Sequence, residues 1–199
     1  MKTRHTLIEQ LRRHRASNEH EEKMRARILA FVEAHEDCFE RSLRIGHVTG
    51  SAWILDRTRQ YTLLTHHAKL DKWLQPGGHA DGDADILGVA VREAEEESGL
   101  KSLRVVSEEI FDVDAHEIPA RGGEPAHVHY DIRFVLEADL TEPLIRTEES
   151  HDLAWVALDH VAGLNTDESV LRMVRKTHYG EDDRLSPDGP FWPARDRQS

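Results

Sequence analysis

Three glutamates near the middle of the chain have the residue type and the spacing to bind a metal ion. Glu93, Glu96 and Glu97 stand at positions i, i+3 and i+4, which places their carboxylates on one face of a helix. Such carboxylates repel one another unless a cation joins them, and hard divalent ions such as Mg²⁺ prefer oxygen ligands. On the triplet alone, a solvated acidic helix face is the commoner explanation, and it is the flanking residues that favour a metal site.

The residues around this triplet predict a turn followed by a helix. Gly77 and Gly78 supply the turn, Asp83 can begin a helix as its N-cap, and Gly99 can end one in a left-handed conformation. Between them, apolar side chains recur at helical spacing, at Ile86, Leu87, Ala90, Val91 and Ala94. The sequence therefore predicts a helix of about four turns over residues 84–98 that carries the three carboxylates.

The whole stretch resembles the signature of a known family. Written as Gly78-x5-Ala84-x7-Arg92-Glu93-Ala94-x-Glu96-Glu97-x-Gly99-Leu100, it resembles the Nudix box, G-x5-E-x7-R-E-U-x-E-E-x-G-U, in which U is an apolar residue. One position departs from the box, because its first glutamate falls on Ala84, and Asp81 or Asp83 can take its place. This departure bears on efficiency and substrate preference more than on metal binding.

The resemblance implies a fold and a reaction. Nudix domains are α/β/α sandwiches with a mixed sheet, and Nudix proteins usually hydrolyse a diphosphate bond, often in a nucleoside diphosphate linked to another moiety. The resemblance also implies Mg²⁺ or Mn²⁺ as the cofactor, bound by Glu93, Glu96, Glu97 and the backbone carbonyl of Gly77. Such an ion neutralises the diphosphate and lowers the pKa of the attacking water.

Two catalytic roles follow from the same resemblance. Arg92 is expected to orient the carboxylates through a forked contact that lysine cannot copy. The general base is either Glu93 or Glu149. Glu149 is a candidate because Nudix domains often carry a glutamate in the loop before a Trp-containing strand, and Glu149 lies six residues before Trp155.

Residues outside the box are candidates for the substrate pocket. Polar and apolar side chains alternate over residues 126–138, which predicts a strand on which His127, His129 and Asp131 share one face. The two histidines can bind a metal or a phosphate, or they can have a hydrogen-bonded structural role. The remaining pocket candidates are Trp73, His79 and Arg121.

The rest of the chain is expected to supply the frame. Helices are expected at residues 3–16, 19–42 and 168–178, and strands at 48–55, 61–65, 103–106, 110–118, 126–138 and 153–156. We therefore expect an N-terminal helical hairpin at residues 1–43, a Nudix hydrolase domain at 44–179 and a loosely ordered tail at 180–199. The hairpin can pack against the domain, form a homodimer surface or select the substrate.

Composition limits the expected partners and location. The formal charge of −12 over 199 residues argues against general binding to nucleic acid. The resemblance to Nudix proteins implies a small phosphorylated substrate, a nucleotide derivative. No apolar run approaches the ~20 residues that span a bilayer. The single cysteine, Cys38, is expected to be a buried helix residue and cannot form an internal disulfide. These features predict a cytoplasmic protein without a membrane partner.

Two other functions are compatible with parts of the pattern. A non-hydrolytic module that binds a ligand or regulates another protein would explain Ala84, although such a module need not keep the three glutamates together. An enzyme similar to isopentenyl diphosphate isomerase would use a metal bound by histidine and glutamate, and His47 and His79 loosely match its histidines. The chain has no cysteine near the Gly77–Gly78 turn, which argues against this isomerase.

Overall fold

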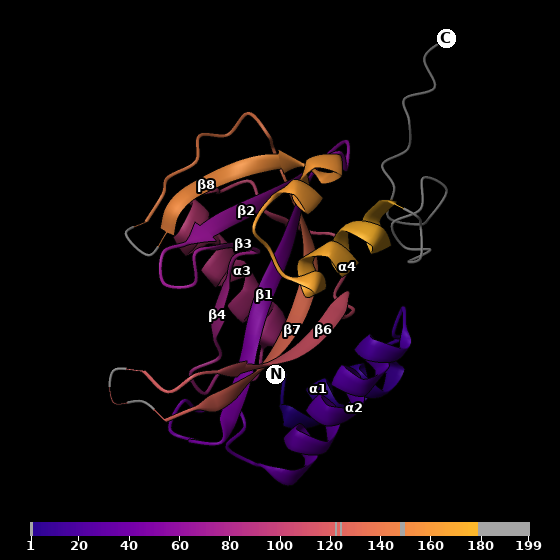
Figure 1. The fold of residues 1–199 in the computed structure, drawn as a ribbon. Helices are drawn as coiled ribbons and strands as arrows, with labels where there is room; N and C mark the ends of the chain where they lie inside the picture. The colour runs from indigo at the N-terminus through magenta and orange to yellow at the C-terminus, as the bar shows by residue number, and fades with distance from the viewer. Residues whose placement is uncertain (1, 122, 124, 148–149, 179–199) are drawn as a thin grey trace.

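A mixed β-sheet with helices on both faces forms the frame of the computed structural model (Figure 1). The structure describes residues 2–121, 123, 125–147 and 150–178. The strands are β1 (Gly46–Asp56), β2 (Tyr61–His67), β3 (Lys72–Leu74), β4 (Gly77–His79), β5 (Arg104–Val105), β6 (Asp112–Ile118), β7 (His127–Ala138) and β8 (Ser150–Ala157). The helices are α1 (Arg4–Arg13), α2 (Glu19–Ala34), α3 (Ile86–Ser98), η1 (Leu158–Gly163) and α4 (Glu168–His178). This arrangement confirms the predicted α/β/α sandwich.

Two long strands, β1 and β7, run parallel to each other in the sheet. They pair along their whole length, from Gly46 opposite Val128 to Asp56 opposite Ala138. Strands β2 and β4 pair antiparallel with β1, and β5 and β6 pair antiparallel with β7. Strands β3 and β8 pair with β2. Because the register of β1 and β7 sets His47 opposite His129, polar side chains from distant parts of the chain meet on one face of the sheet.

The two faces of β1 carry different side chains because residues of a strand alternate. Val48 and Ile54 belong to a large apolar cluster that includes residues of α1, α2 and α3. Trp53 points to the opposite face, where it joins a second cluster with Val170 of α4. The helices of the described residues therefore cover the sheet from both sides, and none of them is long and apolar enough to cross a membrane.

The N-terminal helical hairpin packs into the larger apolar cluster. Leu7 of α1 and Ile28 of α2 are buried in it, and α1 and α2 lie side by side next to β6 in Figure 1. Phe31 of α2 stacks on Tyr130 of β7, with ring centroids 3.9 Å apart. The hairpin therefore shares its core with the sheet.

The second helix is shorter than predicted. Helix α2 ends at Ala34, His35 is extended, and turns follow up to the start of β1. Cys38 lies in these turns, and its carbonyl accepts a hydrogen bond from the N–H of Val48 at 2.8 Å. The predictions that the helix reaches residue 42 and that Cys38 is helical are therefore wrong, although the burial of Cys38 is confirmed. Here a contact with β1 outweighs local helix propensity.

A buried network of charges joins α2, β6, β7 and α4. Asp112 accepts hydrogen bonds from Arg172 at 2.8 Å, from Arg133 at 3.1 Å and from Lys176 at 3.0 Å. Lys176 also donates to Glu21 of α2. Burial on its own would raise the pKa of Asp112, but the hydrogen bond from Arg172 and the charges of Lys176 and Arg133 outweigh it and hold this pKa well below its usual range. The network fastens α2 and α4 to the sheet.

Candidate active site

Helix α3 carries the three glutamates, and local residues set both of its ends. The side chain of Asp85 caps the N-terminus by accepting a hydrogen bond from the N–H of Gly88 at 3.1 Å. Gly99 ends the helix in the left-handed region, with φ of 74°. The expected role of Gly99 is confirmed. The prediction that Asp83 is the N-cap is wrong. Its side chain instead accepts a hydrogen bond from the N–H of Asp85, two residues later, at 2.8 Å.

Strand β4 brings two glycines against this helix. Gly77 and Gly78 were expected to form a turn, but they pair antiparallel with Ser51 and Gly50 of β1. The backbone N–H of Gly77 donates a hydrogen bond to Glu97 Oε1 at 2.9 Å. One carboxylate of the triplet is therefore fixed against the strand.

The close approach of Glu93 requires a glycine at position 78. A Cβ at Gly78 would lie 2.2 Å from Glu93 Oε2 and 2.4 Å from its Cδ, well inside van der Waals contact. The missing side chain leaves room for the Glu93 carboxylate beside the strand. Glu93 and Glu97 therefore reach adjacent residues of β4.

Arg92 links the strand to the carboxylates. Its Nη2 donates to the carbonyl of His79 at 3.2 Å and to Glu93 Oε1 at 3.0 Å. Its Nε lies 3.9 Å from Glu96 Oε1. Arginine suits such a position because its planar guanidinium presents several donors in a rigid fork. The side chain of Glu96 is mostly exposed, so the cluster is open to solvent on that side.

The environment of Glu93 makes its carboxylate more basic. Burial raises the pKa of Glu93, and the hydrogen bond and charge of Arg92 oppose this only in part. A carboxylate with a raised pKa accepts a proton more readily. Glu149, the other expected candidate for the general base, lies outside the described residues, so its role stays a prediction.

The two aspartates expected to replace the first glutamate of the box have other partners. Arg41 donates through Nη2 to Asp81 Oδ2 at 2.6 Å, and Asp83 binds the backbone at the start of α3. Ala84 itself is partly buried against the larger apolar cluster. The contacts of Arg92 run instead to β4 and to its neighbours on α3.

Three of the five pocket candidates come together. His79 Nε2 lies 3.3 Å from His129 Nε2, and His127 Nε2 lies 3.2 Å from the same nitrogen. The contact between the two histidines of β7 confirms that they share a face. Asp131, also expected on that face, accepts hydrogen bonds from the hydroxyls of two β1 residues, Thr49 and Ser51.

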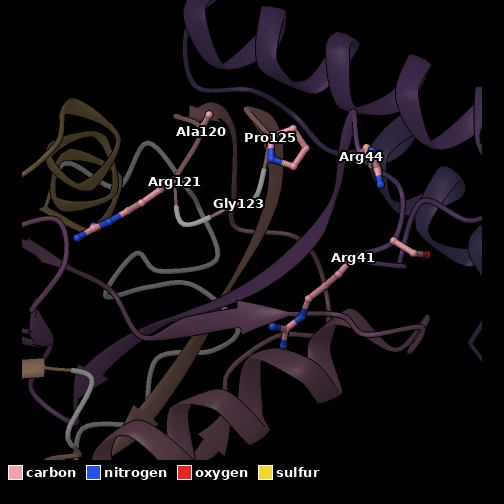
Figure 2. Close-up of a pocket in the computed structure, with 7 residues that line it drawn as sticks. Arg41, Arg44, Ala120, Arg121, Gly123 and Pro125 are labelled. Carbon is pink, nitrogen blue, oxygen red and sulfur yellow. The ribbon is translucent and has the colours of Figure 1, made fainter.

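Arg121 lines an open pocket of about 610 Å³ together with Arg41 and Arg44. Figure 2 shows Arg41 and Arg44 on one side of this pocket and Arg121 on the other. Pro125 also lines the pocket, and its carbonyl accepts a hydrogen bond from His127 Nδ1 at 3.0 Å. The pocket therefore adjoins the histidines. Arg44 and Arg121 favour an anionic ligand there, whereas the charge of Arg41 is already paired with Asp81.

Trp73 belongs to another part of the structure. Its ring stacks on that of His66, with centroids 5.0 Å apart, and it packs against the second apolar cluster. Its backbone N–H donates to the carbonyl of Asn165 at 2.8 Å. The contacts of Trp73 are thus those of a packing residue.

Two histidines near the pocket candidates were not expected there. The ring of His47 lies 5.0 Å from that of His79, 5.1 Å from that of His127 and 5.0 Å from that of His129, between centroids. His116 lies 5.6 Å from His129. The sequence suggested His47 only for the isomerase alternative and gave no signal for His116. Both come to His129 through the registers of β1 and β6 with β7.

The chain matches the model of one domain family and is similar to a known protein. The model of the NUDIX domain matches residues 47–176. The asymmetrical bis(5'-nucleosyl)-tetraphosphatase of Rattus norvegicus is 25% identical over 122 residues, which cover 61% of this chain and 80% of that protein.

Two solved structures are similar in fold. A binary complex of the C. elegans Ap4A hydrolase has a TM-score of 0.53 at 17% identity and covers 65% of this chain and 93% of its own. A NUDIX-family hydrolase from Clostridium perfringens has a TM-score of 0.50 at 24% identity and covers 65% of this chain and 94% of its own. Because the domain model matches residues 47–176, the chain belongs to the NUDIX domain family and is a Nudix-type pyrophosphohydrolase.

Proposed function

We propose that this enzyme uses a divalent metal to hydrolyse a diphosphate bond in a nucleoside diphosphate linked to another moiety. The observation that carries the proposal is the convergence of Glu93 and Glu97 on β4, with Arg92 bridging the strand and Glu93. Carboxylate and carbonyl oxygens are the donors that Mg²⁺ and Mn²⁺ prefer. The room left at Gly78 for a carboxylate supports the same interpretation.

The oxygen donors proposed to hold Mg²⁺ or Mn²⁺ are Glu93, Glu96, Glu97 and the carbonyl of Gly77. A divalent ion at such a site supplies charge neutralisation for a diphosphate and lowers the pKa of a water molecule.

The proton acceptor follows from the contacts of Glu93. Arg92 holds Glu93 Oε1, so we assign Oε2, which faces Gly78, as the atom that accepts the proton from the attacking water. Glu149 is retained as the alternative base. Arg92 acts as a positioning residue, because it fixes the carboxylate of Glu93 relative to the strand.

Dinucleoside tetraphosphates are the first substrates to test. The name of the rat relative, an asymmetrical bis(5'-nucleosyl)-tetraphosphatase, supports this choice. Arg44 and Arg121, which line the pocket, support an anionic substrate, because a chain with a formal charge of −12 needs local cations to attract one. We also propose the cytoplasm as the location, since the one cysteine, Cys38, is a buried free thiol.

The test is a screen of the purified protein against a panel of nucleotide derivatives. The panel contains a dinucleoside tetraphosphate, a nucleoside triphosphate, a nucleotide sugar, a dinucleotide and a coenzyme ester, each with Mg²⁺, with Mn²⁺ and with EDTA. Chromatography identifies the products. Glu93→Gln, purified in the same way, is the control for contaminating hydrolases, because it keeps the size of the side chain and removes its charge.

We expect cleavage of at least one member that requires metal and is strongly reduced in Glu93→Gln. Cleavage that persists in EDTA would contradict the metal-dependent mechanism. If no member is cleaved but one of them raises the melting temperature, the hydrolase proposal fails and the departure at Ala84 marks a binding module.

A further inference from the structure

A cluster of histidines lies on the polar face of the sheet and shares no side chain with the carboxylate cluster of α3. His47 comes from β1, His79 from β4, and His127 and His129 from β7. Within it, nitrogens of His47, His127 and His129 all lie within 4.8 Å of one another. Three strands that are far apart in the sequence thus direct imidazole rings to one point.

The surroundings of His47 are those of a metal-binding histidine. The residue is 4% exposed, and neither of its ring nitrogens makes a hydrogen bond of ordinary geometry to the residues that the structure describes, although the backbone of Leu43 lies close enough for a weak one. Buried polar side chains nearly always make such a bond, and one that makes none calls for an explanation. The rings of three other histidines surround it at about 5 Å between centroids.

The hydrogen bonds of the other rings leave nitrogens with lone pairs that face one another. The carbonyl of Pro125 accepts from His127 Nδ1 at 3.0 Å, so Nε2 of a neutral His127 carries a lone pair. This Nε2 lies 3.2 Å from His129 Nε2, which lies 3.3 Å from His79 Nε2. A single N–H on His129 cannot point straight at both neighbours, so hydrogen bonding alone satisfies this group poorly.

A tetrahedral metal ion would satisfy the same nitrogens. At the usual zinc–nitrogen distance of about 2.0–2.1 Å, two ligand nitrogens lie about 3.3–3.4 Å apart. The observed separations of 3.2 and 3.3 Å are close to this value. The bond from His127 Nδ1 to a backbone carbonyl is also typical of a metal-binding histidine, because it fixes the ring and its tautomer.

We propose that His47, His127 and His129, with His79 in reach as a fourth ligand, form a second metal site that is selective for a transition-metal ion of the zinc class. Imidazole nitrogen suits Zn²⁺, Cu²⁺ and Ni²⁺, whereas Mg²⁺ prefers oxygen. The carboxylate site would therefore bind Mg²⁺ or Mn²⁺, and the imidazole site would bind an ion of the zinc class. This inference does not depend on which diphosphate the enzyme cleaves.

Zinc binding to the untagged, full-length protein tests the proposal. The protein is stripped with a chelator, dialysed against a zinc buffer and analysed for zinc by mass spectrometry, and titration calorimetry gives the affinity. His127→Gln and His129→Gln each remove one ligand, and circular dichroism checks that they fold. His66→Gln is the matched control, because His66 is a partly buried histidine that stacks on Trp73. Glu97→Gln is the control for the carboxylate site.

We expect the wild type, His66→Gln and Glu97→Gln to bind one zinc ion per chain. In His127→Gln and His129→Gln we expect affinity to fall by about ten-fold or more, since even residues that only support a metal ligand change affinity by about 10–100-fold. Substitution with Co²⁺ should give the visible absorption of a tetrahedral nitrogen site in the wild type. Equal zinc affinity in the wild type and both variants, or less than one zinc per wild-type chain, would overturn the proposal.

Discussion

Replacing Gly78 with alanine should reduce turnover and leave the fold intact. The new Cβ would lie 2.2 Å from Glu93 Oε2, whereas ordinary contact begins at 3.4 Å, so the carboxylate has to move by about 1.2 Å. The fold can accommodate this movement because the clash involves the end of a flexible side chain. The movement nevertheless alters the 3.0 Å contact between Glu93 and Arg92. A misplacement of about 1 Å costs on the order of 10²-fold in rate, or about 3 kcal/mol of transition-state stabilisation.

The assay is the kcat of metal-dependent cleavage, measured with the melting temperature on the same samples. Gly163→Ala is the matched control, because a Cβ at Gly163 would meet no heavy atom within 4 Å. We expect kcat to fall on the order of 10²-fold in Gly78→Ala and to keep its wild-type value in Gly163→Ala, with little change in melting temperature in either. A wild-type kcat in Gly78→Ala would refute the assignment of Glu93 to the reacting site.

Two further substitutions test the frame that holds this site. Asp112→Asn breaks the buried charge network and should lower the free energy of unfolding by about 3–5 kcal/mol, measured by urea denaturation. Although burial opposes it, the network holds the pKa of Asp112 below that of an unfolded aspartate. As the pH falls, the unfolded state therefore takes up the proton before the folded state does, and the wild type loses stability below about pH 5. An equal loss of stability with falling pH in Asp112→Asn would count against the network. Asp85→Ala removes the cap bond to Gly88 and should cost about 1 kcal/mol with kcat unchanged; an unaltered urea midpoint would show that the cap contributes nothing.

The parts of the site that could be predicted from the sequence are local. The spacing of Glu93, Glu96 and Glu97 follows from helical periodicity, and Gly99 ends α3 as expected because a left-handed residue strongly favours glycine. The shared face of His127 and His129 follows from the period of two in a strand. Asp85 rather than Asp83 caps α3, which shows that even local boundaries shift by a few residues.

The parts that could not be predicted depend on contacts between distant segments. His47 meets His129 only because β1 and β7 run parallel in one particular register, and a parallel pair leaves no short-range signal in the sequence. Lys176 reaches Glu21 across 155 residues. Helix α2 ends at Ala34 although residues beyond it have helical propensity, because the following turns carry the chain into β1. Such outcomes are set by packing of the whole chain.

The most direct test of the central claim is the binding of Mn²⁺ to the wild type and to Glu97→Gln, measured by electron paramagnetic resonance of the free ion. Glutamine keeps an oxygen that can accept the 2.9 Å hydrogen bond from the N–H of Gly77, so the substitution removes the charge and leaves the packing in place. If the carboxylates of α3 hold the catalytic metal, Mn²⁺ affinity should fall by about ten-fold or more in Glu97→Gln at an unchanged melting temperature. Equal Mn²⁺ affinity in the two proteins would contradict the account.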